Sequence, residues 1–547
     1  MARKVNWSVL LALMSQNAAA QTALDRADPR LIERTLPTPI VPDTGTPAPP
    51  TRAAPTAQDH ARITGIVRAV IVEGRGPLGA EVFATPIADV AGQELSRDDV
   101  AALAGSIAAV ARAQGYPFAT AQVPAQRLRD GILRIALDLG RIDAVRVIGA
   151  RSATADRLLA RALATGAPVR RQQLERALSL AGDVPGVRIV DSRLVRQDGF
   201  GILLVTIEHD RASGYVQLDN RGSKEVGPVR STALASVRDL AQDGDELSLI
   251  VSQTPLQPTE FTFLRARYGA ALGSDGAVLS ASGSLARTRP GGILRTLDVR
   301  GRSADAAIAL QYPLLRTRAR SLWATAELRA LGTDQDLARR RLRRDRIATL
   351  TGTLGGSATL GGGLLRGEVA TLAGLPVGGG TREGSLLASR FDGDARFVAG
   401  TYMVDWTATI GKPFSVVIAS AGQVSSRPLL AAAEIGLGGP AFGRGYDYAE
   451  RTGDNGVMGS FELRVDTGRI SGSVVDRGQV YAFADGGVVG NWRGGFGGGS
   501  LASAGIGLRI GTGRFDWMTE VALPLGPERF DTGDRRPRIS LRVARAF

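Results

Sequence analysis

About the last three-fifths of this 547-residue chain repeats one pattern, in which apolar and polar side chains alternate along segments of roughly ten residues. Clusters of Gly, Asp, Asn and Arg separate these segments. In one segment Leu247, Leu249 and Val251 would share a face of a strand. Ser248 and Ser252 would share the opposite face. A period of two over so many segments predicts β-strands that join into one long sheet.

The predicted signal peptide described below indicates that the chain is exported. A sheet of this length in an exported chain is interpreted as a transmembrane barrel, with apolar side chains toward lipid and polar ones toward the lumen. A soluble sandwich rarely needs more than about 300 residues of unbroken meander. Divided among about 16 antiparallel strands, residues 211–547 leave about 21 residues for each strand and its connection. The 69 glycines suit a tilted, closed sheet. The chain ends on Phe547, and a terminal aromatic residue resembles the recognition end of outer-membrane barrels.

The first 20 residues are predicted to be a secretory signal peptide. Arg3 and Lys4 precede the mostly apolar run 5–14, and an Ala-x-Ala pattern places cleavage between Ala20 and Gln21. The alternative is a short buried helix. No later window has 18 or more apolar, uncharged residues, so no helical membrane anchor is predicted.

Two short segments follow the predicted signal peptide. Residues 21–35 have the composition of a short helix. Residues 36–60 are rich in proline and predict an extended linker of polyproline character, which could span about 60 Å. A helix on such a tether could plug a pore. The alternative is a disordered N-terminal tail.

Residues 61–140 and 141–210 each combine strand and helix patterns and predict two successive α+β units. Within the first, Val100, Leu103 and Ile107 fall at helical spacing, with a capping serine before them and a glycine after them. Each unit is expected to be a small sheet covered by helices.

The end of the first unit, GYPFATAQVPAQRLRDGILRIALDLG, carries a family resemblance. It resembles the first POTRA domain of the two-partner secretion transporters, the haemolysin secretion/activation family of outer-membrane proteins. The positions that carry it are Gly115, Tyr116, Pro124, Gln126, Asp130 and Gly131. The second unit is similar to the second POTRA domain of that family. The resemblance therefore implies two periplasmic POTRA domains in front of the barrel.

A second resemblance lies in the barrel region. The run LGGPAFGRGYDYAERTGDNG, near 438–456, is similar to the family's sixth loop, which enters the lumen, and YAFADGG is similar to its Phe-x-Asp-x-Gly strand. Six residues match: Arg444, Gly445, Tyr446, Phe483, Asp485 and Gly487. The resemblance implies that Arg444 pairs with Asp485 on the inner wall. Gly443 departs from the family, which has an aliphatic residue at this position.

General chemistry makes this pair reasonable without the resemblance. A loop inside a water-filled lumen loses chain entropy, so it needs an anchor. Arg444 offers a planar fork of donors for a carboxylate, Gly445 permits a sharp turn, and Phe483 and Asp485 share one side of a strand. The alternative is that Arg444 is one more solvated arginine of the lumen.

The residue types present exclude several kinds of site. There is no Cys, and His60 and His209 are the two histidines, which rules out disulfide scaffolds, cysteine nucleophiles and Cys/His metal sites. The glycine-rich run 494–500 lacks a strand-to-helix context, so no nucleotide site is predicted. The basic run 338–346 is interpreted as facing lipopolysaccharide phosphates or the lumen rather than nucleic acid. No catalytic residue, metal or cofactor is predicted.

The predicted function is two-partner secretion: POTRA domains in the periplasm capture an unfolded exoprotein, and an outer-membrane barrel translocates it to the cell surface. By resemblance, this client is a β-helical adhesin or haemolysin. Outer-membrane lipids, lipopolysaccharide and the barrel assembly machinery are further expected partners. The alternatives are a barrel-assembly insertase of the same superfamily, a passive porin, and a surface enzyme carried on a barrel. The insertase would have three or five POTRA units, and the porin none.

Overall fold

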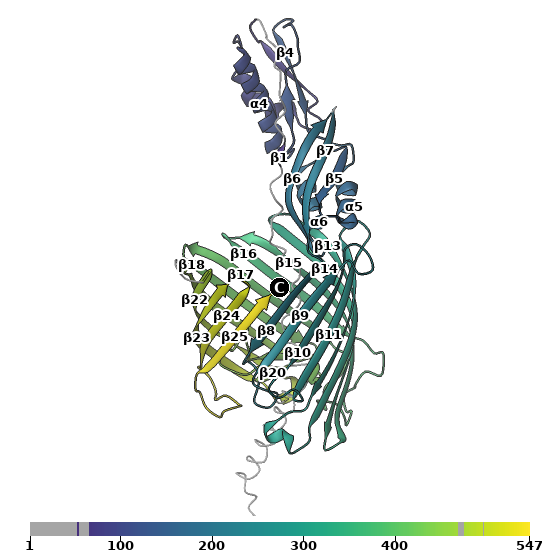
Figure 1. Ribbon diagram of the computed structural model, residues 1–547, viewed down its shortest axis with the longest axis vertical. Helices are drawn as coiled ribbons and strands as arrows, with labels where there is room; N and C mark the ends of the chain where they lie inside the picture. The colour runs from purple at the N-terminus through teal and green to yellow at the C-terminus, as the bar shows by residue number, and fades with distance from the viewer. Residues whose placement is uncertain (1–51, 54–64, 198, 469–474, 496) are drawn as a thin grey trace, which may run out of the picture.

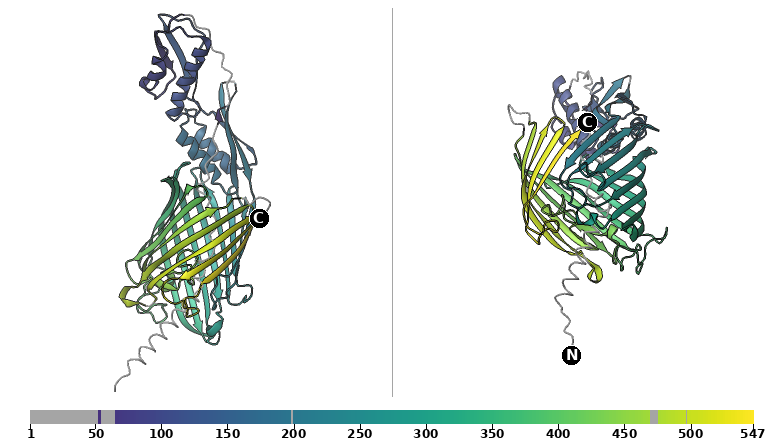
Figure 2. Two further views of the ribbon diagram at one scale, coloured as in Figure 1. Left: turned by 90° about the vertical axis from the view of Figure 1, so that its left-hand side faces the viewer. Right: turned by 60° about the horizontal axis from the view of Figure 1, so that its bottom comes forward.

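The computed structural model describes residues 52–53, 65–197, 199–468, 475–495 and 497–547. The predicted signal peptide, the N-terminal helix and nearly all of the proline-rich linker lie outside these residues. Two small α+β units and one large barrel follow one another along the long axis of the molecule (Figures 1 and 2). None of the described helices is both long and apolar enough to cross a membrane.

The first unit is a three-stranded sheet with helices packed against it. Its elements are β2 (Ala69–Glu73), η1 (Ala80–Phe83), α3 (Ala84–Ala88), α4 (Arg97–Ala113), β3 (Thr120–Gln122) and β4 (Ile132–Asp138). The strands lie in the order β2-β4-β3. Helix α4 begins at a capping box, in which the Ser96 hydroxyl accepts from the Asp99 N–H and the Asp99 carboxylate accepts from the Ser96 N–H. Val100, Leu103 and Ile107 are buried in the core of this unit, as their spacing predicts.

The second unit is a four-stranded sheet with two helices. Its elements are β1 (Arg52–Ala53), β5 (Ala144–Gly149), α5 (Ala153–Leu163), α6 (Arg171–Gly182), β6 (Val187–Gln197) and β7 (Phe200–His209). The strands lie in the order β1-β6-β7-β5. Strand β1, which belongs to the predicted linker, pairs in parallel with Arg193 and Leu194 of β6. Part of one sheet edge is therefore already covered by the chain itself.

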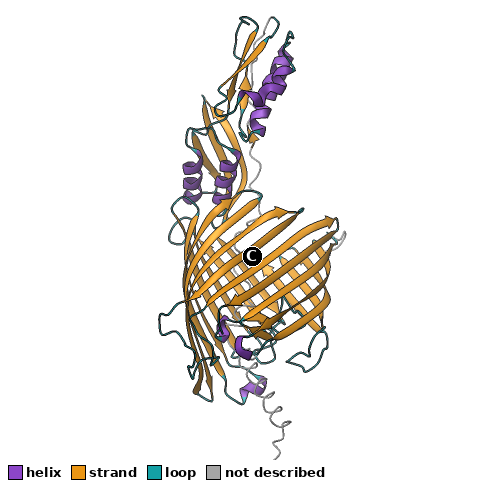
Figure 3. Cartoon of the chain, turned by 180° about the vertical axis from the view of Figure 1, so that it is seen from behind, coloured by secondary structure: helices purple, strands orange, loops and turns teal. Residues whose placement is uncertain are grey.

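Sixteen strands of the described residues form one closed barrel (Figure 3). They are β8 (Ala212–Asp219), β9 (Arg230–Arg238), β10 (Asp245–Gln253), β11 (Phe261–Leu272), β12 (Ala277–Thr288), β13 (Arg300–Arg316), β14 (Arg320–Leu337), β15 (Arg340–Leu360), β16 (Gly363–Gly374), β17 (Val398–Gly411), β18 (Phe414–Ser425), β21 (Asn455–Asp466), β22 (Arg477–Gly490), β23 (Gly499–Thr512), β24 (Phe515–Pro524) and β25 (Arg538–Ala546). All neighbours are antiparallel, and β25 closes the barrel against β8. The predicted barrel of about 16 antiparallel strands is confirmed.

The side chains of the barrel strands alternate as the sequence predicts. Leu249 and Val251 of β10 are 39% and 44% exposed on the outer face, whereas Ser248 and Ser252 are buried on the inner face. Phe547 directly follows β25, and its N–H donates to the Gly214 carbonyl at 2.8 Å. The outer face is thus apolar, and the last residue extends the pairing that closes the barrel.

The second unit is docked on one end of the barrel through polar contacts. Arg316, at the end of β13, donates to both carboxylate oxygens of Asp183, which follows α6, at 2.7 and 2.6 Å. Asp243, in the β9–β10 turn, accepts from the N–H groups of Ala153 and Thr154 at the start of α5. Burial alone would raise the pKa of Asp243, but these and further hydrogen bonds outweigh burial and hold it below its usual value. These contacts identify the end of the barrel that faces the two units.

Candidate functional site inside the barrel

The connection between β18 and β21 is a long loop, residues 426–454, that folds against the inner wall. It contains the short elements η3 (Ala431–Ala433), β19 (Ile435–Leu437) and β20 (Arg451–Gly453). The predicted loop, near 438–456, lies within this connection except for its last two residues. Its last two residues already pair with β22, because Asn455 begins β21.

Arg444 at the loop tip lies among three carboxylates of the inner wall. Its Nη1 is 2.8 Å from Glu462 Oε2 and 3.3 Å from Glu520 Oε2, and its Nε is 3.1 Å from Asp485 Oδ2. The guanidinium carbon lies 4.2 Å from the centre of the Phe483 ring, which adds a cation–π contact. The side chain of Arg444 is 10% exposed. The structure therefore places it at a buried, charge-paired position of the wall.

Asp485 binds the backbone of the loop tip more than its arginine. One carboxylate oxygen, Oδ1, accepts from the N–H groups of Gly443 at 2.9 Å and Arg444 at 3.2 Å, and also from the Ser503 hydroxyl. The contact between Arg444 Nε and the other oxygen is an ion pair whose geometry does not make a hydrogen bond. The sequence suggested a fork held by one carboxylate. In the structure, three carboxylates contact the Arg444 guanidinium instead, because side chains of β21, β22 and β24 point to the same place in the lumen.

Tyr446 fastens the tip to the loop between β24 and β25. Its hydroxyl donates to the Pro527 carbonyl at 3.0 Å and accepts from the Gly526 N–H at 3.0 Å. The ring is fully buried and packs in a cluster with Leu437 and Phe442 of the same loop and with wall residues of β21 to β23. Both polar and apolar contacts of Tyr446 thus connect the tip to the wall.

Three glycines of the motifs have different structural reasons. Gly443 has φ = +73°, a conformation that favours glycine and disfavours the aliphatic residue of the family at this position. Arg444 and Gly445 form the turn that the sequence suggested, closed by the Tyr446 N–H, which donates to the Gly443 carbonyl at 3.0 Å, but Gly445 does not have a positive φ. A Cβ on Gly445 would lie 3.0 Å from Pro524 N and 3.1 Å from Ser503 Cβ, so the close approach to the wall requires glycine. A Cβ on Gly487 would lie 2.6 Å from the Val457 carbonyl oxygen of the neighbouring strand.

Replacing Gly445 with valine will displace the loop tip. The first added carbon already meets backbone of β24 at 3.0 Å, and backbone cannot move aside as a flexible side chain can. We expect trypsin to cleave at Arg444 in whole cells at least about tenfold faster in Gly445→Val than in the wild type, since even about 1.4 kcal/mol of lost binding shifts the released population tenfold. Gly352→Val is the matched control, because Gly352 lies on the outer face of β15 without a positive φ and nothing lies within 4 Å of its Cβ position. Equal cleavage in Gly445→Val and the wild type would contradict this account.

Two residues that complete the site, Glu462 and Glu520, were not predicted from the sequence. Glu462 also pairs with Arg464 at 2.6 Å and with Arg509 at 2.8 Å. Glu520 pairs with Arg221 at 3.0 Å and accepts from the Tyr481 hydroxyl at 2.9 Å. A carboxylate at an inward-facing strand position was the available signal, but its partner across the lumen could not be read from the sequence. Among the described residues, no group of three or more acidic or histidine side chains is placed to hold a metal ion.

The matches to family models cover both the barrel and the first unit. The model for haemolysin secretion/activation protein ShlB/FhaC/HecB matches residues 201–510, more than half of the chain. The chain belongs to this family. The model for the POTRA domain of ShlB type matches residues 66–139. The first unit of the fold is accordingly a POTRA domain.

Individual relatives of this family member agree with the assignment. The heme/hemopexin transporter protein HuxB of Haemophilus influenzae strain 86-028NP is 24% identical over 387 residues, which is 68% of this chain and 67% of HuxB. CdiB from Escherichia coli shares the fold with a TM-score of 0.71 at 18% identity, over 98% of each chain. BamA from Haemophilus ducreyi, without POTRA domains 1–3, is less similar, with a TM-score of 0.55 at 14% identity, over 90% of this chain and 100% of that one.

Family membership places this haemolysin secretion/activation protein among the two-partner secretion transporters. It is an outer-membrane β-barrel with its POTRA domains in the periplasm, and it works with a secreted exoprotein partner. The family is one of transporters, not of enzymes. The end of the barrel on which the second unit is docked is therefore the periplasmic end.

Proposed function

We propose that this transporter exports a single exoprotein, of the β-helical adhesin or haemolysin type, while Arg444 and Tyr446 hold the loop tip on the inner wall. The observation that carries the proposal is the burial of Arg444 among Glu462, Asp485 and Glu520. Beside the anchored loop the lumen keeps a cavity of about 520 Å³, bordered by the loop and by inward-facing residues of β14 to β18. The position of the loop therefore sets the width of the path that a client takes.

Client capture is proposed to occur at the free strand edges of the POTRA sheets. An extended client segment can add to such an edge through main-chain hydrogen bonds, which depend little on client sequence. Strands β2 and β3 are the edges of the first sheet, and β5 is an edge of the second. At the opposite edge, β1 pairs with Arg193 and Leu194 of β6. Among the described residues, no strand pairs on that side with the bulge near Val190, which is 43% exposed. Two linked weak contacts would give selectivity without stalling the client.

Photo-crosslinking tests this proposal in whole cells that carry the full-length chain. A crosslinking amino acid at Ile148 of β5 or Val190 of β6 is expected to capture the protein that disappears from the supernatant when the chain is deleted. These side chains are 37% and 43% exposed beside the proposed edges. Gln172, on the exposed side of α6, is the matched control and should not crosslink. Crosslinks from Gln172 alone would refute strand addition, and a supernatant unchanged by deletion would favour the passive porin.

Further parts of the proposal concern domains and surroundings. We assign residues 61–140 and 141–210 to the two POTRA domains and 211–547 to the barrel. The buried side chains of the two POTRA domains form two clusters, one in each domain, and Phe118 of the first domain packs in the cluster of the second. The many exposed apolar side chains of the barrel support contact with outer-membrane lipids. We also propose that the barrel assembly machinery inserts this barrel into the outer membrane. Folding of the client outside the cell supplies the driving force, because the sequence contains no nucleotide-binding motif.

A further inference from the structure

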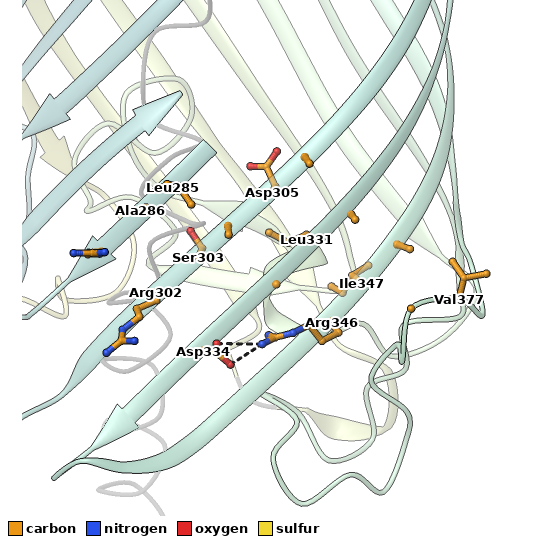
Figure 4. A pocket seen from close by; sticks show the side chains of 17 residues that line it. Leu285, Ala286, Arg302, Ser303, Asp305, Leu331, Asp334, Arg346, Ile347 and Val377 are labelled. Atoms are coloured by element: carbon orange, nitrogen blue, oxygen red, sulfur yellow. Dashed lines mark hydrogen bonds and ion pairs between the residues drawn. The ribbon is translucent and has the colours of Figure 1, made fainter. Parts of the chain in front are cut away.

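The outer wall of the barrel carries a groove of about 600 Å³ on strands β12 to β15 (Figure 4). Ile308, Leu328 and Leu350 mark the outer face of β13, β14 and β15, since they are 59%, 52% and 48% exposed. Residues at even spacing from them share that face. The floor of the groove consists of such outward-facing small residues, namely Ala304, Ala306, Ala330, Gly332 and Ala348. By the same spacing, ten of the seventeen lining residues face outward, so the groove opens toward the membrane.

The groove lies at the extracellular boundary of the apolar band. The second unit is docked on the β9–β10 turn and on the β13 end that carries Arg316, so those parts of the strands are periplasmic. Along β15, toward the end away from the periplasm, the outward-facing side chains change from Leu350 through Ala348 to Arg346. An arginine toward lipid is tolerated near the membrane interface but not at its centre. Arg346 thus marks the level at which hydrocarbon ends and headgroups begin.

Two arginines of the groove lie directly opposite each other. Arg287 of β12 is the register partner of Arg302 of β13, and both are exposed. Like charges at opposed positions repel. Within the part of the chain that the structure describes, neither side chain has an ion-pair or hydrogen-bond partner. The opposed pair therefore presents two free guanidinium groups at the headgroup level.

The carboxylate opposite Arg302 on the next strand does not neutralise this pair. Asp334 is the register partner of Arg302 on β14. However, both of its oxygens lie 3.1 Å from Arg346 Nη2 (Figure 4). Its Oδ1 is also 3.3 Å from Arg344 Nε. The rim of the groove therefore keeps a net positive charge, next to a floor that is apolar and hollow.

We propose that this groove binds lipopolysaccharide, with a lipid A phosphate between Arg287 and Arg302 and an acyl chain on the alanine floor. A phosphate accepts from two guanidinium forks at once, which turns the repulsion between them into attraction. The small residues leave the space that an acyl chain fills. The proposed lipid contacts thereby gain one lipid class and one site on the barrel. This inference rests on the outer-membrane location of the barrel and does not depend on client export.

Native mass spectrometry of the full-length chain in detergent tests the site with purified lipid A. Arg287→Gln together with Arg302→Gln is expected to weaken binding of bisphosphorylated lipid A at least tenfold. Arg320→Gln is the matched control, because Arg320 shares the outer face of β14 but lies at its periplasmic end, and its effect should stay within twofold. Ala306→Leu with Ala330→Leu should weaken lipid A but not its deacylated phosphorylated disaccharide.

Several results would overturn the inference. They are unchanged lipid A binding in the double arginine variant, an equal loss in Arg320→Gln, or equal affinity for dephosphorylated lipid A. Equal affinity for the deacylated disaccharide would assign a phosphate site that is not a lipid site. Without lipid, the double arginine variant should be at least as heat-resistant as the wild type, because the opposed charges are gone. Client export should persist in it, so failure here is distinguishable from failure of the transport proposal.

Discussion

Replacing Arg444 with alanine will lower client secretion by more than about tenfold while the barrel remains folded in the outer membrane. The substitution leaves Glu462, Asp485 and Glu520 without the loop's positive charge at a buried position. Removing one partner of a buried ion pair typically costs about 3–5 kcal/mol, and each 1.4 kcal/mol changes a population about tenfold. Most loop tips would therefore leave the wall. Secretion is measured as client in the supernatant relative to barrel content of the membrane.

Graded variants separate the contributions of charge and backbone contacts. Arg444→Lys keeps the charge without the fork, so an intermediate loss is expected. Asp485→Asn keeps the Oδ1 acceptor for the Gly443 and Arg444 N–H groups and should be milder than Asp485→Ala. Arg464→Ala is the matched control, because Arg464 also pairs with Glu462 but belongs to the wall. If Arg444→Ala exports client at the wild-type rate, or Arg464→Ala reduces export equally, the anchor role is wrong.

A disulfide tests whether the tip stays on the wall during transport. A Cβ on Gly443 would lie 3.8 Å from Leu501 Cβ, which suits the mean Cβ separation of about 3.8 Å in disulfides. The chain contains no other cysteine, so Gly443→Cys with Leu501→Cys allows only one bond within the chain. Export should continue with this bond closed. A block that a reductant relieves would show that the tip must leave the wall.

Deleting residues 22–56 will raise the single-channel conductance in planar bilayers several-fold and leave part of the secretion activity. The expectation rests on the sequence, in which a short helical segment and a proline-rich tether of about 60 Å precede the POTRA domains. A helix on that tether would occupy the pore at rest and leave it when a client arrives. Unchanged conductance would favour a disordered tail without a plugging role.

A smaller deletion, compared with that of 22–56, separates the plug from the strand that the same segment contributes. Deletion of 22–35 removes the predicted helical segment and keeps β1, so conductance should rise while the covered part of β6 stays covered. Deletion of 22–56 also removes β1 and should increase crosslinking of client at Val190. A rise in crosslinking with both deletions would show that β1 does not shield the edge.

Local patterns were sufficient for the architecture of the protein. The alternation of Leu249 and Val251 with Ser248 and Ser252 predicted strands with one apolar face, because successive side chains of a strand point to opposite sides. Repeated over the whole C-terminal region, it predicted the barrel and its approximate strand number. Helix α4 was likewise predicted from its spacing and its capping serine. Such features depend on residues a few positions apart, which one sequence contains in full.

The details of the loop site depended on residues that are distant in the chain. Motif resemblance named Arg444 and Asp485, and the structure brings them together, but it also places Glu462 and Glu520 within 2.8 and 3.3 Å of the guanidinium. The reason that Gly445 is glycine also lies elsewhere, in the backbone of β24. A local sequence pattern does not predict which inward-facing side chains of a closed barrel lie at the same height in the lumen. The tilt of the strands and their register together decide this.

By itself, the sequence determined the fold class, the order of the two α+β units and the barrel, and the two motifs that meet in the lumen. Only the tertiary structure decided which carboxylates surround Arg444, how β1 covers an edge of the second sheet, and that Arg287 and Arg302 lie opposite each other. The physical reason is that alternation and capping act over a few residues. Contacts across the lumen and between strands act over tens or hundreds of residues, and only closure of the barrel sets them.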